Sequence, residues 1–188
     1  MGGLADVASL TARLSRSLAD RDVRHAISGD PAMAAHGLVR TTTSVEILVV
    51  APSLQWARAF EAVREHGFSG GDRELIASLR DRYAAEMRSG PWAVEIFVPV
   101  LPYHGTLVDR AVRIDVNGVD VPFVSLEDLI VLKFLWHRTK DVADAHALIA
   151  GGGLRIDAEY VRVTLGSILP ADDARHEELR GLLERFGG

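Results

Sequence analysis

The sequence contains no cysteine, so disulfides, cysteine-bound zinc and a cysteine nucleophile are all excluded. Only two of the 21 basic residues are lysines, and this composition, rich in alanine, arginine and glycine, is typical of a bacterial genome with a high GC content. No apolar run reaches the roughly 18–20 residues that a membrane-spanning helix needs. The first residues also lack the basic and apolar segments of a signal peptide. We therefore expect a cytoplasmic protein without a membrane-spanning part.

Positive charge is outweighed by negative charge. The 188 residues carry a formal net charge of −5, and 48% of them are hydrophobic, which is enough to build a core. The length fits one domain, or one domain with a helical appendage. A protein that binds nucleic acid through its charge is usually basic, so this balance argues against such a partner. The arginines between Arg13 and Arg24 leave two interpretations open, a local basic patch or a solvated helix face.

Several segments place apolar residues three or four positions apart, which is the period of a helix with one buried face. The segment that begins at Ser125 also carries a typical helix cap, Ser-Leu-Glu-Asp. A run of three glycines at 151–153 breaks the pattern near the end of the chain. We predict helices over residues 4–20, 31–36, 53–66, 74–88 and 125–138, from 140 onward, and over 158–165 and 172–186.

Other segments are short, apolar and rich in β-branched residues, which is typical of buried strands. Asn117-Gly118 separates two of them and indicates a tight hairpin. The predicted strands are 25–28, 45–50, 92–100, 112–116 and 119–124. Together these elements predict an α/β protein of the α+β kind, with a small mixed sheet, flanking helices and a helical C-terminal part. We assign residues 1–124 to the core and 125–188 to a helical region packed on it, in one structural unit.

Residues 27–50 read ISGDPAMAAHGLVRTTTSVEILVV: a strand end, a glycine turn, a short helix and a second strand. This stretch resembles the core of the minimal nucleotidyltransferase superfamily, and within it the AbiEii-type branch, whose pattern is Gly-Gly-x-Ala-x-x-x-His-Gly-x-x-Arg-x-Thr-x-Asp-hydrophobic-Asp. The later helices of that branch resemble residues 125–133 and 140–144, so the resemblance extends over roughly residues 20–150. The matching residues in the first stretch are Gly29, Ala32, His36, Gly37, Arg40 and Thr42.

The resemblance implies an enzyme that moves a nucleoside monophosphate from an NTP to a hydroxyl group, with two Mg²⁺ ions held by carboxylates. Mg²⁺ prefers such hard oxygen ligands, and two carboxylates at positions i and i+2 of a strand point to the same face. Here the Asp-x-Asp pair falls on Ser44 and Glu46, and the third carboxylate falls on Glu95. These three are the candidate catalytic residues, and Glu46 and Glu95 are the candidate ligands of one Mg²⁺ ion.

Two departures from the pattern oppose a metal-bound triphosphate. The hydroxyl of Ser44 binds Mg²⁺ more weakly than a carboxylate does. Asp30 replaces the second glycine of the turn, and two like charges at about 4 Å repel each other by roughly 4 kcal/mol at an effective dielectric constant near 20. Asp30 is alternatively a replacement metal ligand. Glu46 and Glu95 either face a shared cleft or face solvent, and Ser44 is either a polar remnant or a working hydroxyl. Candidate bases for such a hydroxyl are His25, His36 and His104.

Seven residues are candidates for binding substrate or phosphate. Arg40 either reaches a phosphate or pairs with Asp30. Lys133 either contacts phosphate or substrate, or lies along the core with its ammonium in water. Residues 101–105 follow a strand end, where ligand-binding loops tend to lie, and they add two candidates. The seven are Ser28, Gly29, Asp30, Arg40, Tyr103, His104 and Lys133.

Two hypotheses for the function follow. In the first, the protein keeps the nucleotidyltransferase fold with an altered active site. It binds a nucleotide or another small molecule and has a repurposed or regulatory role, for example in a toxin–antitoxin-like pair. In the second, it is an active metal-dependent nucleotidyltransferase. The apolar positions of the last helix either close the core or form a face for a partner protein or a second copy. They are Leu179, Leu182, Leu183 and Phe186.

Overall fold

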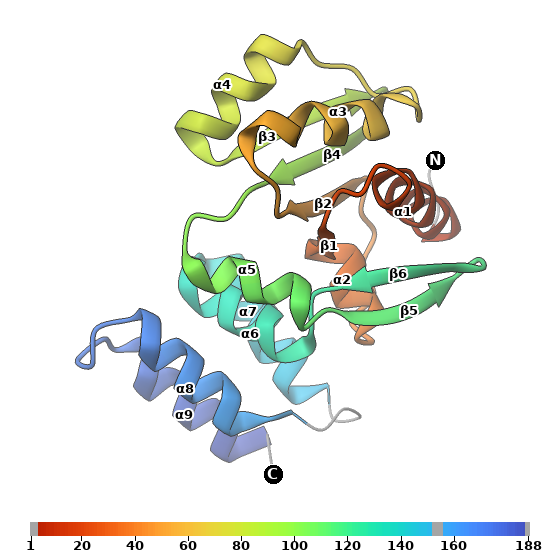
Figure 1. The fold of residues 1–188 in the computed structure, drawn as a ribbon. Coiled ribbons are helices and arrows are strands. Elements are labelled where there is room, and N and C mark those ends of the chain that lie inside the picture. The colour runs from red at the N-terminus through yellow and green to blue at the C-terminus, as the bar shows by residue number, and fades with distance from the viewer. Residues whose placement is uncertain (1–3, 152–155, 187–188) are drawn as a thin grey trace. The chain divides into compact units, whose positions relative to one another are not determined.

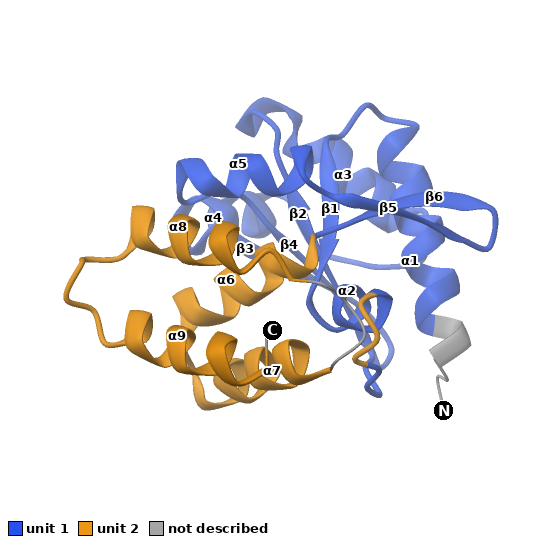
Figure 2. Cartoon of the chain, turned by 90° about the horizontal axis from the view of Figure 1, so that it is seen from below, with its two compact units in different colours: residues 1–35, 39–124 blue, residues 36–38, 125–188 orange. Residues whose placement is uncertain are grey.

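The computed structural model describes residues 4–151 and 156–186. They divide into two compact units, residues 1–35 with 39–124 and residues 36–38 with 125–188 (Figure 2). The sheet belongs to the first unit, and helices make up the second. The predicted fold class, a mixed sheet with flanking helices and a helical C-terminal part, is confirmed.

Six strands in the described part of the chain form one sheet, in the order β3-β4-β2-β1-β6-β5 (Figure 1). β1 and β2 are antiparallel, whereas β1 pairs with β6, and β2 with β4, in parallel. Both residues of the predicted Asn117-Gly118 turn have positive φ, as a tight hairpin requires. The strands are β1 (His25–Ser28), β2 (Ser44–Val49), β3 (Ala84–Ser89), β4 (Trp92–Phe97), β5 (Val112–Val116) and β6 (Val119–Phe123).

The helices of the first unit bury their apolar faces against the sheet and against one another. α1 buries Val7, Leu10, Leu14 and Leu18, at steps of three or four residues, and contacts α3, β1 and β6. α4 contacts α3 and the edge strand β3. The helices are α1 (Leu4–Ala19), α2 (Gly29–Ala35), the 3-10 helix η1 (Ser53–Gln55), α3 (Trp56–Arg64), α4 (Asp72–Arg82) and α5 (Pro102–Asp109).

The helix predicted over residues 74–88 is wrong in its second half. α4 ends where Tyr83 adopts a left-handed conformation with φ of 59°, and the strand β3 follows. Within β3, Ala85 and Met87 are buried while Glu86 and Arg88 are exposed, which is the two-residue period of a strand. Pairing with β4 along the whole of β3 outweighs the helix propensity of these side chains.

The loop expected over residues 101–105 is a second correction. Pro102 begins helix α5, and the residue before it has an extended backbone. Proline fits the first turn of a helix because its missing N–H has no partner there. The sequence pattern therefore did not reveal that a helix begins shortly after the end of β4.

The second unit contains α6 (Leu126–Trp136), α7 (Thr139–Ala150), α8 (Ala158–Ile168) and α9 (Arg175–Phe186). The predicted cap of α6 is confirmed, because the Ser125 hydroxyl accepts a hydrogen bond from the Asp128 N–H at 3.2 Å. The buried carboxylate of Asp128 accepts two more, from the hydroxyls of Ser125 at 2.7 Å and Tyr160 at 2.6 Å. Gly152 and Gly153 of the predicted break lie outside the described residues.

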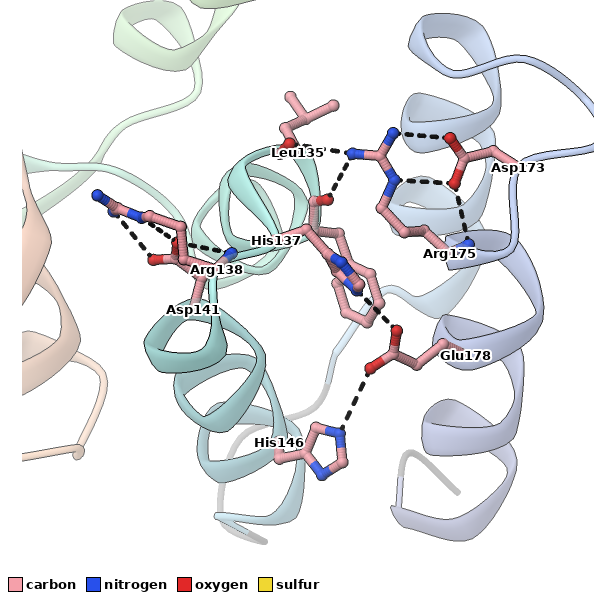
Figure 3. Close-up of polar contacts among 9 residues, drawn as sticks. Leu135, His137, Arg138, Asp141, His146, Asp173, Arg175 and Glu178 are labelled. Carbon is pink, nitrogen blue, oxygen red and sulfur yellow. Dashed lines mark hydrogen bonds and ion pairs between the residues drawn. The ribbon is translucent and has the colours of Figure 1, made fainter.

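A network of charged side chains ties the end of α6 to α9 (Figure 3). Arg175 donates to the carbonyls of Phe134 at 3.2 Å and Leu135 at 3.0 Å, which have no partner inside the helix. The carboxylate of Asp173 holds the same guanidinium at 2.7–2.8 Å. The hydrogen bonds from Arg175 hold the pKa of Asp173 well below the usual range. Arg175 thus caps one helix from the start of another.

The last helix closes the core of the second unit. Leu179, Leu182 and Leu183 of α9 are buried, and the helix contacts α7 and α8. Phe186 is 42% exposed. No helix among residues 4–151 and 156–186 has both the length and the apolar character needed to cross a membrane.

Candidate functional site

A carboxylate lies against the glycine with which α2 begins, directly after β1. Gly29 has φ of +63°, a backbone conformation that residues other than glycine rarely adopt. A Cβ added there would lie 2.5 Å from Oε1 and 2.9 Å from Oε2 of Glu46. The Glu46 carboxylate therefore lies directly against the Cα of Gly29, and only glycine fits beside it.

Three of the predicted site residues stand side by side across the sheet. Ser28 is in register with Glu46, and Glu46 is in register with Glu95 on the next strand. Residues in register on neighbouring strands point to the same face. Ser28 is buried, Glu46 is half-buried and Glu95 is exposed, so the row leads from the core to the surface.

A fourth residue, Glu86 on β3, continues this row because it is in register with Glu95. Arg88 donates to its two carboxylate oxygens, at 2.6 and 2.9 Å. Sequence reasoning missed Glu86 because it placed the segment in a helix. The alternation of small or apolar residues with charged ones over Ala85–Arg88 was the signal that could have found it. We call Ser28, Glu46, Glu95 and Glu86 the acidic row.

Ser44 lies two residues before Glu46 on β2, so both side chains are on the same face. Its hydroxyl lies 3.2 Å from that of Thr42, which also accepts the Ser44 N–H at 3.1 Å. One candidate base is engaged elsewhere: His25 donates from Nδ1 to the Val23 carbonyl at 2.8 Å, and its Nε2 accepts from the Ser15 hydroxyl at 2.9 Å. Burial lowers the pKa of His25, which keeps the ring neutral.

Asp30 and Arg40 both line a cavity of about 180 Å³ in the first unit. Thr42 contributes to the same wall, together with residues of α1, β5 and β6. The Oδ1 atom of Asp30 is buried there and has no hydrogen-bond partner among the described residues. The structure thus places two predicted phosphate-binding residues at one cavity.

Tyr103 and His104 lie in the first turn of α5. His104 is buried, its Nδ1 accepts the Val100 N–H at 3.0 Å, and burial lowers its pKa. This hydrogen bond fixes the entry into α5, which is a structural role. The Tyr103 carbonyl accepts from the Thr106 hydroxyl at 2.7 Å. A role for either residue in ligand binding stays a prediction.

Lys133 lies on α6 in the second unit, and its ammonium does not reach water as one interpretation expected. It is 5% exposed and contacts Asp141 at 3.2 Å and Asp144 at 2.9 Å. Arg138 also binds Asp141, at 2.6 Å. Burial alone would raise the pKa of Asp141, but the hydrogen bonds and charges of Arg138 and Lys133 outweigh it and lower that pKa. These contacts make an ion cluster between α6 and α7 in which Lys133, Asp141 and Asp144 are buried and Arg138 is exposed.

Among the described residues, no three side chains of His, Asp or Glu lie close enough together to hold a metal ion. A larger cavity of the first unit, about 760 Å³, lies beyond the ends of β2 and β4. None of the predicted site residues lines it.

Solved structures with a similar fold are known. Two are structures of the antibiotic-resistance factor ANT(2'')-Ia. The solution structure is 14% identical over 95% of this chain and 97% of that chain, with a TM-score of 0.57. The crystal structure, in complex with adenylyl-2''-tobramycin, is 14% identical over 93% and 97%, with a TM-score of 0.56. The fold is that of a nucleotidyltransferase.

A third solved structure with the nucleotidyltransferase fold agrees. It is an antigenic nucleotidyltransferase-like protein from Paracoccidioides brasiliensis, 16% identical over 95% of this chain and 92% of that chain, with a TM-score of 0.50. No model of a known protein family matches the sequence, and no curated protein matches it. Identity at this level carries the fold and leaves the activity to the site residues.

Proposed function

We propose that this nucleotidyltransferase-fold protein binds a nucleotide or another small molecule at the acidic row, and that its altered site no longer performs standard metal-dependent nucleotidyl transfer. The observation on which this proposal rests is that the Glu46 carboxylate lies against the Cα of Gly29. Glutamate is one methylene longer than the aspartate that the family pattern has here. The extra length carries negative charge onto the glycine turn, which opposes a phosphate at the same place.

The donor set does not fit a pair of Mg²⁺ ions. Such a pair needs several carboxylates converging on it, because Mg²⁺ requires near-octahedral oxygen coordination. Ser44 supplies a hydroxyl in contact with Thr42 in place of the first carboxylate. The lack of any cluster of three metal-binding side chains in the described residues supports this interpretation. A single Mg²⁺ between Glu46 and Glu95 stays a prediction.

In this proposal, the ligand contacts Ser28 and Gly29 at the end of β1, and Arg40 beside α2. A protein that binds without turnover suits a regulatory role, exerted on a partner protein as in a toxin–antitoxin-like pair. The adenylyl-2''-tobramycin in the crystal structure of ANT(2'')-Ia is a precedent for a small-molecule ligand on this fold.

An active nucleotidyltransferase is the second candidate, and one observation favours it. Glu46 and Glu95 are in register on adjacent parallel strands, so two carboxylates face the same side within reach of one divalent ion. That ion would neutralise their mutual repulsion and polarise an attacking hydroxyl.

Thermal unfolding with each NTP, with and without Mg²⁺ or Mn²⁺, separates the two candidates. A ligand that binds only the folded protein raises the midpoint. We expect no metal-dependent rise with any NTP at millimolar concentration. A rise that requires the metal and disappears in Glu95→Gln would show a metal-dependent nucleotide site and would support the active enzyme instead. Glu127→Gln, a glutamate of the second unit, is the matched control.

The triple variant Ser44→Asp, Glu46→Asp and Asp30→Gly restores the three altered positions of the pattern. If these changes account for the lost activity, this variant gains metal-dependent stabilisation by an NTP. If it gains none, the changes at Asp30, Ser44 and Glu46 do not explain the loss, and the proposed cause is wrong.

A further inference from the structure

The strand β5 forms one edge of the sheet (Figure 1). Among the described residues it pairs with β6 alone, to which a two-residue turn joins it. In such a hairpin the residues that flank the turn form a hydrogen-bonded pair, and further along the strands every second pair does so. Val116 flanks the turn, so Val112, Ile114 and Val116 bond to β6. The backbone N–H and C=O groups of Arg113 and Asp115 therefore point away from β6, along the open edge.

This edge is open to a strand from another molecule. Arg113 and Asp115 are exposed, and within residues 4–151 and 156–186 their backbone groups bond to nothing beyond the hairpin. Val112, whose side chain lies on the other face of β5, is 41% exposed. A row of unpaired N–H and C=O groups is a template on which a further strand can pair.

The charges at this edge leave one carboxylate without a cation. Asp115 is in register with Asp120 on β6, and like charges directly opposite each other destabilise a sheet. Arg113 donates from Nε to Oδ2 of Asp120 at 2.5 Å. Asp115 accepts the Gly118 N–H at 3.2 Å, and it forms no ion pair within the part of the chain that the structure describes. A cation from outside the chain would therefore stabilise the edge.

We propose that β5 pairs antiparallel with β5 of a second copy of this chain, about a twofold axis beside Ile114. The strand reads Val-Arg-Ile-Asp-Val, with one charge of each sign on either side of its central residue. In this register Arg113 of each copy stands opposite Asp115 of the other. The outward backbone groups then bond to each other, and each Asp115 gains the cation that it lacks. On the other face, Val112 meets Val116, and a twofold axis repeats every contact.

The charge pattern selects this partner and this register. Parallel pairing in register would place Arg113 beside Arg113 and Asp115 beside Asp115, and like charges repel. A slip by one residue would turn each strand over, with its charged face against the valines of the other. Five residues a side are few beside the roughly 20–30 of a standard interface. We therefore expect a weak, reversible dimer with a Kd between about 1 µM and 1 mM. The acidic row lies on β1 to β4, so the dimer does not depend on the proposed function.

Analytical ultracentrifugation of the full chain measures the association directly. Between about 1 µM and 1 mM protein, the weight-average mass should rise from that of a monomer towards that of a dimer. A chain that stays monomeric over this whole range would overturn the proposal.

Charge reversal tests the register. Arg113→Glu places two carboxylates opposite each other in both pairs, and Asp115→Arg places two guanidinium groups there, so each variant should associate about tenfold or more weakly. An equimolar mixture of the two variants restores opposite charges at both pairs and should associate at least as well as the unaltered chain. Arg73→Glu and Asp81→Arg, at exposed positions of α4, are the matched controls. Neither control should weaken association, and mixing them should not strengthen it. Full association of Arg113→Glu alone would contradict the assignment.

Amide hydrogen exchange, followed by NMR on the unaltered chain, gives a check that needs no variant. The N–H groups of Arg113 and Asp115 are free in the monomer and bonded in the dimer, so their exchange should slow as the protein concentration rises. The N–H of Ile114 bonds to β6 in both states and should change far less. A dimer that forms without slower exchange at Arg113 and Asp115 would lie on another surface, and the proposal would be wrong.

Discussion

Replacement of Gly29 by alanine tests the contact on which the account of the site rests. Two effects add. Alanine in the left-handed region costs about 1–2 kcal/mol. The new Cβ would lie 2.5 Å from Oε1 of Glu46, so the carboxylate must leave its place. Overpacking of this kind costs about 1–3 kcal/mol more.

Gly90→Ala is the matched control for the first effect. Gly90 has φ of +56°, close to the +63° of Gly29, but an added Cβ meets nothing within 4 Å. For a chain of this length, 1 kcal/mol moves the unfolding midpoint by about 2–4 °C. We therefore expect about 2–8 °C for Gly90→Ala, and a larger loss for Gly29→Ala.

Urea unfolding of a double-mutant cycle isolates the second effect. Glu46→Ala removes the carboxylate, so the double variant with Gly29→Ala should be about 1–3 kcal/mol more stable than the sum of the single changes predicts. Equal losses for Gly29→Ala and Gly90→Ala, with no coupling to Glu46, would show that the carboxylate does not lie on the turn.

Other parts of the molecule give three further predictions. Lys133→Met leaves Asp141 and Asp144 buried without their lysine and should cost about 3–5 kcal/mol in urea unfolding, whereas exposed Lys140→Met should change little. Tyr160→Phe removes a donor to buried Asp128 and should cost about 1–3 kcal/mol, with exposed Tyr83→Phe as the neutral comparison. Burial lowers the pKa of His25, so the unfolded chain binds the proton more readily. Stability should thus be full above about pH 6.5 and fall as the pH is lowered toward 5, with a shallower fall in His25→Gln; an unchanged slope would contradict this.

Much of the first unit could be predicted because the sequence signals for its helices and turns lie within short segments of the chain. Apolar periodicity identified α1, and Asn117-Gly118 fixed the β5–β6 hairpin. β3 was missed because Ala84–Ser89 has residues that favour a helix, and pairing with β4 decides its conformation. Glu86 was missed with it. The start of α5 was not predicted because a proline such as Pro102 is equally typical of a turn.

The candidate site was predictable in part for the same reason. Residues that lie on one strand or one turn, such as Ser44, Glu46 and Gly29, could be related through strand geometry. The side chain of Asp30 could not be placed, because its surroundings come from α1 and β5, which are distant in sequence.

Calorimetric titration of Mg²⁺-bound NTPs into the unaltered protein and into Ser44→Asp/Glu46→Asp/Asp30→Gly tests the central claim most directly. The account predicts no metal-dependent binding heat for the unaltered chain and a saturable one for the triple variant. Saturable binding of a Mg²⁺-bound NTP to the unaltered chain, lost on Glu46→Gln, would contradict it.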